Sequence, residues 1–391
     1  MTNNLIIGLD DQDKYIEINS HHQHLLLIAP TGTGKGVGFV LPNLLSSQDS
    51  IIVHDIKLEN YILTSGWRSS QGQKIYVFDP LNREGKTHCY NPLDFINKDP
   101  DLMIDDIQKI ANLLLPENEF WHDHARNLFL SLVLYKAKSI GEIYRMLMSD
   151  LVKELEAGIK KHKIHATGIM LINSFLNKNQ QEQSGIISTL ATALSLWSNP
   201  LIDKATSKSD FNPADFRKEK STLYVGLQPS DIQRLQPLMQ FFYQHAAQSL
   251  ISYTPDQKKE PHGVLFMLDE FPSLGNMEHF ITSIPYFGGY RVRALMIIQN
   301  FGHLRMSYTD EEVNIILSNS TFKIAFTAYD YETADEVAKI AVDQISSDEI
   351  MHLSKDKQIL CIDGDHALVT KKLRYFERKE LKDRITDPVL F

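Results

Sequence analysis

Short runs of apolar and β-branched residues recur along the chain without strict alternation of apolar and polar positions. The runs cover residues 24–29, 50–55, 74–79, 221–227, 263–270, 294–299 and 322–326. Such runs predict strands that are covered on both faces, as in a parallel sheet between helices. Apolar residues at helical spacing lie between several of them, for example at 233–252 and 332–341. We therefore expect an α/β fold with a mostly parallel sheet.

The strand pattern stops between residues 97 and 215. Apolar residues there recur every three or four positions, in stretches such as "LMIDDIQKIANLLLP" and "SGIISTLATALSLWS", which predicts helices. Pro92 and "FNPADF" (211–216) bound this part. We expect an all-α inserted domain at 97–215, with residues 1–96 and 216–391 forming the α/β domain. Two late strands are expected within 358–376, with Gly364 at the turn between them.

Composition narrows the class of protein. The chain has 391 residues, 43% hydrophobic and 23% charged, which is globular composition at a length greater than one comfortable core. A net charge of −9 disfavours a protein that coats duplex DNA, so any nucleic-acid contact is expected to be local. Two cysteines exclude a disulfide framework. No run approaches the roughly 20 apolar residues of a membrane span, and the start is unlike a signal peptide, so we expect a soluble chain.

The stretch "APTGTGKG" lies between a predicted strand and a predicted helix, which is the setting of a phosphate-binding loop. Gly32 and Gly34 permit positive φ angles, which turn successive backbone N–H groups toward a phosphate chain. Lys35 is expected to reach the β- and γ-phosphates, and the helix N-terminus adds its dipole. The alternative is a glycine-rich turn with a solvent-exposed lysine. The predicted nucleotide-binding residues are Pro30, Thr31, Gly32, Thr33, Gly34, Lys35, Gly36 and Val37.

Gly36 stands where a P-loop normally has Ser or Thr, whose hydroxyl binds magnesium. Either water or Thr33 is then expected to supply the missing ligand. Glycine costs about 1 kcal/mol relative to alanine inside a helix, so Gly36 and Gly38 indicate close approach of the backbone to a ligand or to the sheet. Pro42 is expected to end or kink this helix.

A second motif, "VLFMLDEF", places Asp269 and Glu270 at the end of an apolar strand, as in a Walker B strand. Asp269 is predicted to hold Mg²⁺, directly or through water, and Glu270 to orient and deprotonate an attacking water. The alternative is a solvated acidic turn. Gln299 ends the next strand and is predicted to sense the γ-phosphate, unless it only ends the strand. Arg291 and Arg293 precede that strand, and each is either solvated or stabilises transition-state charge in a neighbouring subunit.

Three groups of histidines, "HHQH" (21–24), "HDH" (122–124) and "HKIH" (162–165), suggest metal sites. None is accompanied by cysteines or carboxylates at zinc-ligand spacing. We interpret all three groups as structural or solvated.

Longer stretches extend the pattern beyond the nucleotide motifs. They are "APTGTGKGVGFVLPNLL", "DSIIVHDIKLE", "YNPLDFI", "FWHDHARNLFLSLVLY", "LYVGLQPSDIQRL", "MLDEFPSLG" and "QILCIDG…KLRYF". With these stretches the chain resembles the TraG/VirD-type coupling proteins, the hexameric ATPases of conjugation and type IV secretion. The stretches follow that family's order over nearly the whole chain, and the GKG form of the loop belongs to the family's pattern. Leu58 stands where the family usually has Gly.

The resemblance implies a RecA-like P-loop NTPase with an inserted all-α domain, ATP and Mg²⁺ as cofactors, and a homo-hexameric ring. It implies partners as well: type IV secretion channel proteins, accessory adaptor proteins, and a single-stranded DNA–relaxase complex or protein effectors bound through the all-α domain. The implied location is the cytoplasmic face of the bacterial inner membrane. Family members usually carry N-terminal transmembrane helices, which this sequence lacks, so we expect a soluble piece of such a protein or a membrane-free relative.

Two other functions are compatible with these motifs. The first is a DNA translocase or helicase of the FtsK/HerA kind, which the family-order stretches outside the nucleotide motifs disfavour. The second is a substrate-docking adaptor that binds nucleotide weakly and is no motor. ATPase activity separates the adaptor from both motors.

Overall fold

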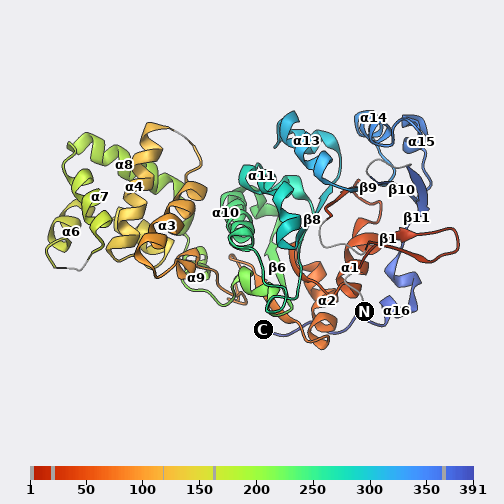
Figure 1. Cartoon of the computed structure of the whole chain (residues 1–391), viewed down its shortest axis with the longest axis horizontal. Helices are drawn as coiled ribbons and strands as arrows, with labels where there is room; N and C mark the ends of the chain where they lie inside the picture. The colour runs from red at the N-terminus through yellow and green to blue at the C-terminus, as the bar shows by residue number, and fades with distance from the viewer. Residues whose placement is uncertain (1–3, 19–22, 118, 162–163, 363–366) are drawn as a thin grey trace. The chain divides into compact units, whose positions relative to one another are not determined.

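The computed structural model describes residues 4–18, 23–117, 119–161, 164–362 and 367–391 (Figure 1). The expected turn at Gly364 and the histidines His21, His22 and His162 lie outside the described residues. The chain divides into two compact units. The first comprises Met1–Val77, Pro213–Gln236 and Ala246–Phe391, and the second comprises Phe78–Asn212 and Pro237–His245.

The first unit is built on one mixed sheet. Across the described residues its strand order is β2-β1-β11-β10-β9-β3-β8-β7-β4-β6-β5. In Figure 1 the late strand β11 (blue) lies beside β1 (red), so strands from the N-terminal and C-terminal parts of the chain pair in this sheet. In chain order the strands are β1 Leu5–Leu9, β2 Tyr15–Ile18, β3 Leu25–Ile28, β4 Ser50–Ile56, β5 Lys74–Phe78, β6 Ser221–Leu227, β7 Val264–Leu268, β8 Val292–Ile298, β9 Phe322–Ala325, β10 Lys357–Ile362 and β11 Leu368–Lys371.

The middle of the sheet is parallel, as the runs of apolar residues predicted. Strand β3 pairs in parallel with β8 on one side and with β9 on the other. Strand β7 pairs in parallel with β8 and β4, and β4 with β6. The antiparallel pairs join β9 to β10, β10 to β11, β11 to β1 and β1 to β2. All residues of β3, β7 and β8 are buried, so both faces of the central strands are covered.

Helices of the first unit cover this sheet. They are η1 Gly36–Val40, α1 Leu41–Ser46, α2 Glu59–Ser70, α11 Glu278–Phe287, α12 Phe301–Arg305, α13 Asp310–Asn319, α14 Tyr331–Ile340, α15 Ser347–Met351 and α16 Lys379–Lys382. Helix α10 spans Ile232–Ile251, of which Pro237–His245 belong to the second unit. The side chain of buried Asn43 joins α1 to β1. Its amide oxygen accepts a 2.8 Å hydrogen bond from the N–H of Ile6, and its amide nitrogen donates a 2.9 Å hydrogen bond to the carbonyl of Ile6.

The segment after the P-loop differs from the expected single helix. Gly36–Val40 form one π-helical turn, in which the N–H of Leu41 donates to the carbonyl of Gly36. The regular α-helix α1 then begins at Leu41 and continues through Pro42 to Ser46. Pro42 therefore does not end the helix. It directly follows Leu41, whose N–H makes the hydrogen bond that closes the π-helical turn.

The second unit is helical. Its helices are α3 Pro100–Leu114, α4 Phe120–Tyr135, α5 Ile140–Leu147, α6 Leu151–Gly158, α7 Ala166–Leu176, α8 Gln180–Ala193 and α9 Pro200–Ala205. The unit is larger than the helical pattern at 97–215 and starts at Phe78. An aromatic cluster accounts for the difference, since Phe78, Tyr90, Phe211 and Phe242 pack with ring centroids 5.0–6.4 Å apart. Periodicity within single helices cannot reveal such a cluster.

Candidate nucleotide-binding site

The loop after β3 has the conformation that its glycines predict. Gly32 and Gly34 have φ angles of +79° and +89°, which residues with a Cβ rarely adopt. The Thr33 hydroxyl donates a 2.6 Å hydrogen bond to the carbonyl of Pro30, which closes the loop. The π-helical turn starts immediately after Lys35. The strand, the glycine-rich loop and the helical turn together form a P-loop that can bind phosphates through backbone N–H groups.

Lys35 meets the acidic pair at the carboxyl end of the sheet. Its ammonium forms ion pairs with Asp269, at 3.1 Å from Oδ1, and with Oε1 of Glu270. Both acidic residues directly follow β7, which is separated from β3 only by β8. Gln299 follows β8 and donates a 2.7 Å hydrogen bond from Nε2 to Oε2 of Glu270. The fold thus brings together four predicted site residues from three parallel strands.

Glu270 is held in a strained conformation. Its φ and ψ angles of 54° and 47° lie in the left-handed region, which is costly for a residue with a Cβ and is found preferentially at functional sites. Each carboxylate oxygen has its own partner, Lys35 on one side and Gln299 on the other. The carboxylate is therefore oriented before any ligand binds.

Asp269 has the donor atoms for a magnesium ion. Its Oδ1 is buried and, apart from the ammonium of Lys35, has no hydrogen-bond partner among the described residues. A carboxylate oxygen with open coordination is a ligand that Mg²⁺ prefers. A Cβ at Gly36 would meet no other atom within 4 Å, so the space beside the loop is open at this position. The residues present fit a magnesium ion that is held mainly from β7.

A second aspartate lies on the strand next to β7. Asp55 of β4 is buried and accepts hydrogen bonds from the backbone N–H groups of Asn60 and Tyr61, at 3.0 and 2.7 Å. Burial raises the pKa of Asp55 to about 7, and the negative charge of Asp269 adds to the shift. The sequence prediction missed Asp55, although the run "SIIVHD" ends with an acidic residue much as β7 does. Its hydrogen bonds anchor the start of α2 beside the site.

The family resemblance predicts glycine at position 58, where this chain has leucine. The backbone conformation of the turn between Asp55 and α2 gives the reason for that expectation. Leu58 has a φ of 58° and lies in the left-handed region, as does Lys57. Glycine adopts this conformation without cost. In this chain the Leu58 side chain covers Gly226 of β6, where an added Cβ would lie 2.7 Å from Leu58 Cδ2. Packing against that glycine compensates for the backbone conformation.

The two predicted arginines are not brought to this site. Arg291 and Arg293 lie at the opposite, amino-terminal end of β8. Arg293 is 1% exposed and forms an ion pair with equally buried Asp49. The Arg291 guanidinium donates a weak 3.4 Å hydrogen bond to the carbonyl of Glu260. We therefore do not propose Arg293 as a residue that acts in a neighbouring subunit, because removing it from Asp49 would leave a buried charge unpaired.

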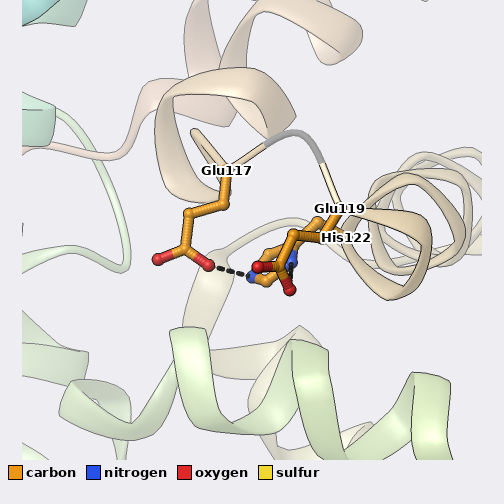
Figure 2. A group of neighbouring side chains, drawn as sticks. All are labelled: Glu117, Glu119 and His122. Atoms are coloured by element: carbon orange, nitrogen blue, oxygen red, sulfur yellow. Dashed lines mark ion pairs between the residues drawn. The ribbon is translucent and has the colours of Figure 1, made fainter.

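A group of possible metal ligands lies at the start of helix α4 of the second unit (Figure 2). The Nε2 atom of His122 is 3.1 Å from Glu117, and its Nδ1 atom is 3.8 Å from Glu119. These ligand atoms lie within 4.8 Å of one another. Both glutamate side chains are about two-thirds exposed, at 67% and 71%. Solvated ion pairs account for this arrangement, and we place no metal here.

The fold and the site define the class of protein. A P-loop after one parallel strand, an acidic pair after a second and a glutamine after a third are the arrangement of a RecA-like P-loop NTPase. The chain belongs to the family "Type IV secretory system Conjugative DNA transfer", whose model matches residues 2–341 and 344–391.

Known relatives agree with this assignment. The chain is 31% identical to Protein VirD4 of Rhizobium radiobacter, over 93% of this chain and 58% of that protein. It is 29% identical to Conjugal transfer protein TraG of Escherichia coli, over 85% of this chain and 57% of that protein. The structure of plasmid coupling protein TrwB in complex with ADP and Mg²⁺ shares the fold, with a TM-score of 0.71, 15% identity and 95% of each chain covered.

The chain spans somewhat under two thirds of the length of the VirD4 and TraG proteins that it matches. Within the described residues, no helix is both long enough and apolar enough to cross a membrane.

Proposed function

We propose that this chain is an ATP-driven coupling ATPase that recruits DNA, effector proteins or both and moves them into a type IV secretion system. Family membership supports the biological setting. One observation carries the enzymatic part of the proposal: Lys35 of the P-loop pairs with Asp269 and Glu270, while Gln299 binds Glu270. These side chains supply a cation for the phosphates, a magnesium ligand, a base and a contact for the γ-phosphate.

Each residue has a chemical role in this proposal. The loop amides and Lys35 bind the phosphate chain, and Asp269 holds Mg²⁺, which when bound neutralises charge on the phosphate oxygens. The Lys35 ammonium cannot bind the phosphates and keep its full ion pair with Glu270 at the same time. Because phosphates draw the ammonium toward themselves, ATP binding releases Oε1 of Glu270. That oxygen can then accept a proton from the attacking water, while Gln299 keeps the carboxylate oriented and responds to the γ-phosphate.

The experiment that tests hydrolysis is steady-state Mg²⁺-dependent ATP turnover by the assembled protein. Glu270→Gln is expected to lower turnover about 100-fold or more while leaving ATP binding intact, because the base is lost but the loop is not. Lys35→Ala is expected to remove both binding and turnover. Wild-type turnover no higher than that of these two variants would refute the motor and favour an adaptor that binds nucleotide weakly.

The partners and the location also belong to this proposal. We propose a homo-hexameric ring at the cytoplasmic face of the bacterial inner membrane, in contact with secretion channel proteins and, where present, adaptor proteins. TrwB binds ADP and Mg²⁺ on the same fold, which supports ATP and Mg²⁺ as cofactors here. The helical second unit is the proposed docking domain for a single-stranded DNA–relaxase complex or for effectors.

Cargo can be identified with the full chain as bait. The helical segment 97–215 lacks Phe78 and Tyr90 of the aromatic cluster that completes its unit, so the whole chain is the better bait. Capture of effector proteins without relaxase or DNA would indicate effector secretion. Stimulation of ATP turnover by bare duplex DNA, with no relaxase or effector captured, would favour a translocase of the FtsK/HerA kind.

A further inference from the structure

Residues 384–391, here called the docked segment, follow α16 without forming a helix or a strand and run past α2 (Figure 1). Helix α2 binds the backbone of this segment with two side chains. The N–H of Val389 donates a 3.1 Å hydrogen bond to the Ser65 hydroxyl, and the carbonyl of Val389 accepts a hydrogen bond from the Tyr61 hydroxyl. Because residues four apart lie on one face of a helix, Tyr61 and Ser65 form a site that holds both backbone groups of one residue.

Other residues of α2 allow the docked segment to lie close to the helix. A Cβ at Gly66 would overlap the backbone carbonyl oxygen of Asp387, so only glycine permits this approach. The Arg384 guanidinium lies 5.1 Å from the centre of the Trp67 ring and donates a 3.0 Å hydrogen bond to the carbonyl of Leu45. Helix α2 therefore contacts the segment over nearly two turns.

The docked segment buries little apolar surface. Leu390 and Phe391 are 89% and 52% exposed, and Val389 is only partly buried. A neutral hydrogen bond contributes little net stability, and segments with few buried apolar contacts open locally while the rest of a fold persists. The segment can therefore leave α2 without unfolding of the sheet.

Tyr61 joins the docked segment to the proposed magnesium site. Its hydroxyl binds the segment, and its backbone N–H donates a 2.7 Å hydrogen bond to Oδ2 of Asp55, which is 1% exposed. In the parallel pair of β4 and β7, His54 is level with Leu268. Asp55 directly follows His54 and Asp269 directly follows Leu268, so the two carboxylates lie at the same level of adjacent strands.

The groups around a metal-binding carboxylate orient it and thereby influence the affinity for the metal. Asp55 is such a neighbour of Asp269, and its own position depends on the start of α2, since the N–H groups of Asn60 and Tyr61 hold it. A docked segment restrains this end of α2 through the Tyr61 hydroxyl. Contacts between described residues thus lead from the segment to the neighbour of the magnesium ligand.

We propose that Tyr61 is a positioning residue for the magnesium site, through which docking of residues 384–391 on α2 regulates the affinity for Mg²⁺. Release of the segment lets Asp55 shift beside Asp269 and weakens Mg²⁺ binding. Mg²⁺ binding in turn strengthens docking, because coupling between two sites is reciprocal. The inference rests on the proposed function, since it concerns the metal of the same reaction, but it names residues outside the nucleotide-binding loop.

The first test measures ATP turnover of the full chain against free Mg²⁺. Tyr61→Phe removes the hydroxyl and keeps the ring and the N–H that binds Asp55. The Mg²⁺ concentration for half-maximal turnover is expected to rise about three- to tenfold, at or below the lower end of the effect of losing a direct partner of a ligand, because Tyr61 acts through Asp55. Turnover at saturating Mg²⁺ is expected to stay near the wild-type value. A merely structural defect would lower maximal turnover and leave the half-saturating concentration unchanged.

The second test needs no turnover. Amide hydrogen exchange of the peptide that contains Val389 is followed in the presence of a non-hydrolysable ATP analogue, with and without Mg²⁺. In the wild type, Mg²⁺ is expected to slow this exchange by about the factor measured in the first test, as reciprocity requires. In Tyr61→Phe the exchange is expected to be faster and no longer to respond to Mg²⁺. Ser65→Ala, which removes the other hydrogen bond to Val389, is expected to speed the exchange as well.

Tyr253→Phe is the matched control. It removes another tyrosine hydroxyl, which donates a 2.6 Å hydrogen bond to Glu260 before the amino-terminal end of β7. Neither the half-saturating Mg²⁺ concentration nor the exchange of the docked segment is expected to change. A rise in the Mg²⁺ requirement equal to that of Tyr61→Phe would overturn the specific role of Tyr61.

The outcomes distinguish this inference from the proposed function. Faster exchange in Tyr61→Phe with an unchanged Mg²⁺ requirement would overturn the coupling alone. Unchanged exchange in Tyr61→Phe would show that the hydroxyl does not hold the segment, and would also overturn the inference. A wild type that neither binds nor hydrolyses ATP overturns the proposed function and this inference with it.

Discussion

We propose that the metal site of this P-loop depends on Asp269, because the loop itself supplies no hydroxyl after its lysine. Gly36 has open space where a Cβ would point, and the Thr33 hydroxyl donates to the carbonyl of Pro30 within the loop. Asp269 Oδ1, by contrast, is buried with Lys35 as its described partner. At the scale of single residues, Asp269 is the only one of these three positions that supplies a negatively charged oxygen to the site.

Substitutions at these two positions are therefore expected to differ. Asp269→Ala should abolish Mg²⁺-dependent ATP turnover, because it removes the protein's proposed magnesium ligand. Gly36→Ser should leave turnover near the wild-type level, because its side chain enters open space. Turnover of both variants measured over a Mg²⁺ titration decides the point. Near-normal turnover in Asp269→Ala, or a severe defect in Gly36→Ser, would contradict the account.

A buried histidine makes the stability of the first unit depend on pH. The Nδ1 atom of His24 accepts a 3.0 Å hydrogen bond from the N–H of Ala294, and Nε2 faces the carbonyl of Ile284 at 3.1 Å, which requires the neutral ring. Burial lowers the pKa of His24 to about 4. Since the unfolded chain takes up this proton near pH 6.5 and the folded chain only near pH 4, stability falls as the pH drops through this window.

We expect His24 to cost the wild type about 2 kcal/mol of unfolding free energy between pH 7 and pH 5. The difference in unfolding free energy between the wild type and His24→Gln, measured by urea titration, should therefore be smaller at pH 5 than at pH 7 by that amount. His303→Gln, at an exposed histidine, serves as the control and should show a gap that does not change. A gap for His24→Gln that stays constant would show that the buried ring does not govern this dependence.

At the scale of elements, the helical turn after the P-loop is pressed against the C-terminal segment. A Cβ at Gly38 would lie 2.7 Å from the carbonyl oxygen of Leu373, whereas one at Gly36 would touch nothing within 4 Å. The two glycines of the same π-helical turn are thus present for different reasons. Gly38 permits close approach of the backbone of "KLRYF", and this approach also places Lys372 beside the loop.

The two glycines form a matched pair for measurement. Gly38→Ala should destabilise the chain by about 1–3 kcal/mol, because the added methyl forces the Leu373 backbone away. Gly36→Ala should be neutral or stabilise by up to about 1 kcal/mol, as alanine favours a helical conformation. Chemical unfolding of both variants tests this difference. Similar stabilities for the two would exclude the contact with Leu373 as the reason for Gly38.

At the scale of the whole molecule, the proposed ring makes activity a property of the assembly. Neither Arg291 nor Arg293 reaches the site, since both lie at the other end of β8. Arg374 lies beside the P-loop, but Asp356 and Glu377 already pair with it. We propose that an arginine of another subunit adds positive charge at the leaving phosphates, as arginine fingers do in NTPases.

We therefore expect ATP turnover per chain to rise with protein concentration. Turnover measured beside sedimentation velocity should increase as the hexamer replaces the monomer, while ATP binding per chain stays constant. Full turnover per chain in samples that remain monomeric would contradict the need for a neighbouring subunit.

The sequence alone was sufficient to predict features that depend on residues close together in the chain. The positive φ of Gly32 and Gly34, the buried parallel strands and the helices of the second unit follow from residue type and spacing. The acidic pair after β7 could be found because it directly follows a run of apolar residues that predicts a strand. The same signal near the end of β4 would have identified Asp55.

Only the tertiary structure decided features that depend on distant parts of the chain. Burial against Asp49 made Arg293 a core residue, and the Leu373 carbonyl explained Gly38. The position of Lys372 beside Thr33 depends on a sheet in which β11 joins β1 and β10. Spacing along the chain reports which residues share a helix or strand, whereas strand order and packing determine which strands meet. The P-loop and the acidic pair could be recognised in the sequence, whereas a cavity beside the loop depends on strands from the C-terminal part of the chain.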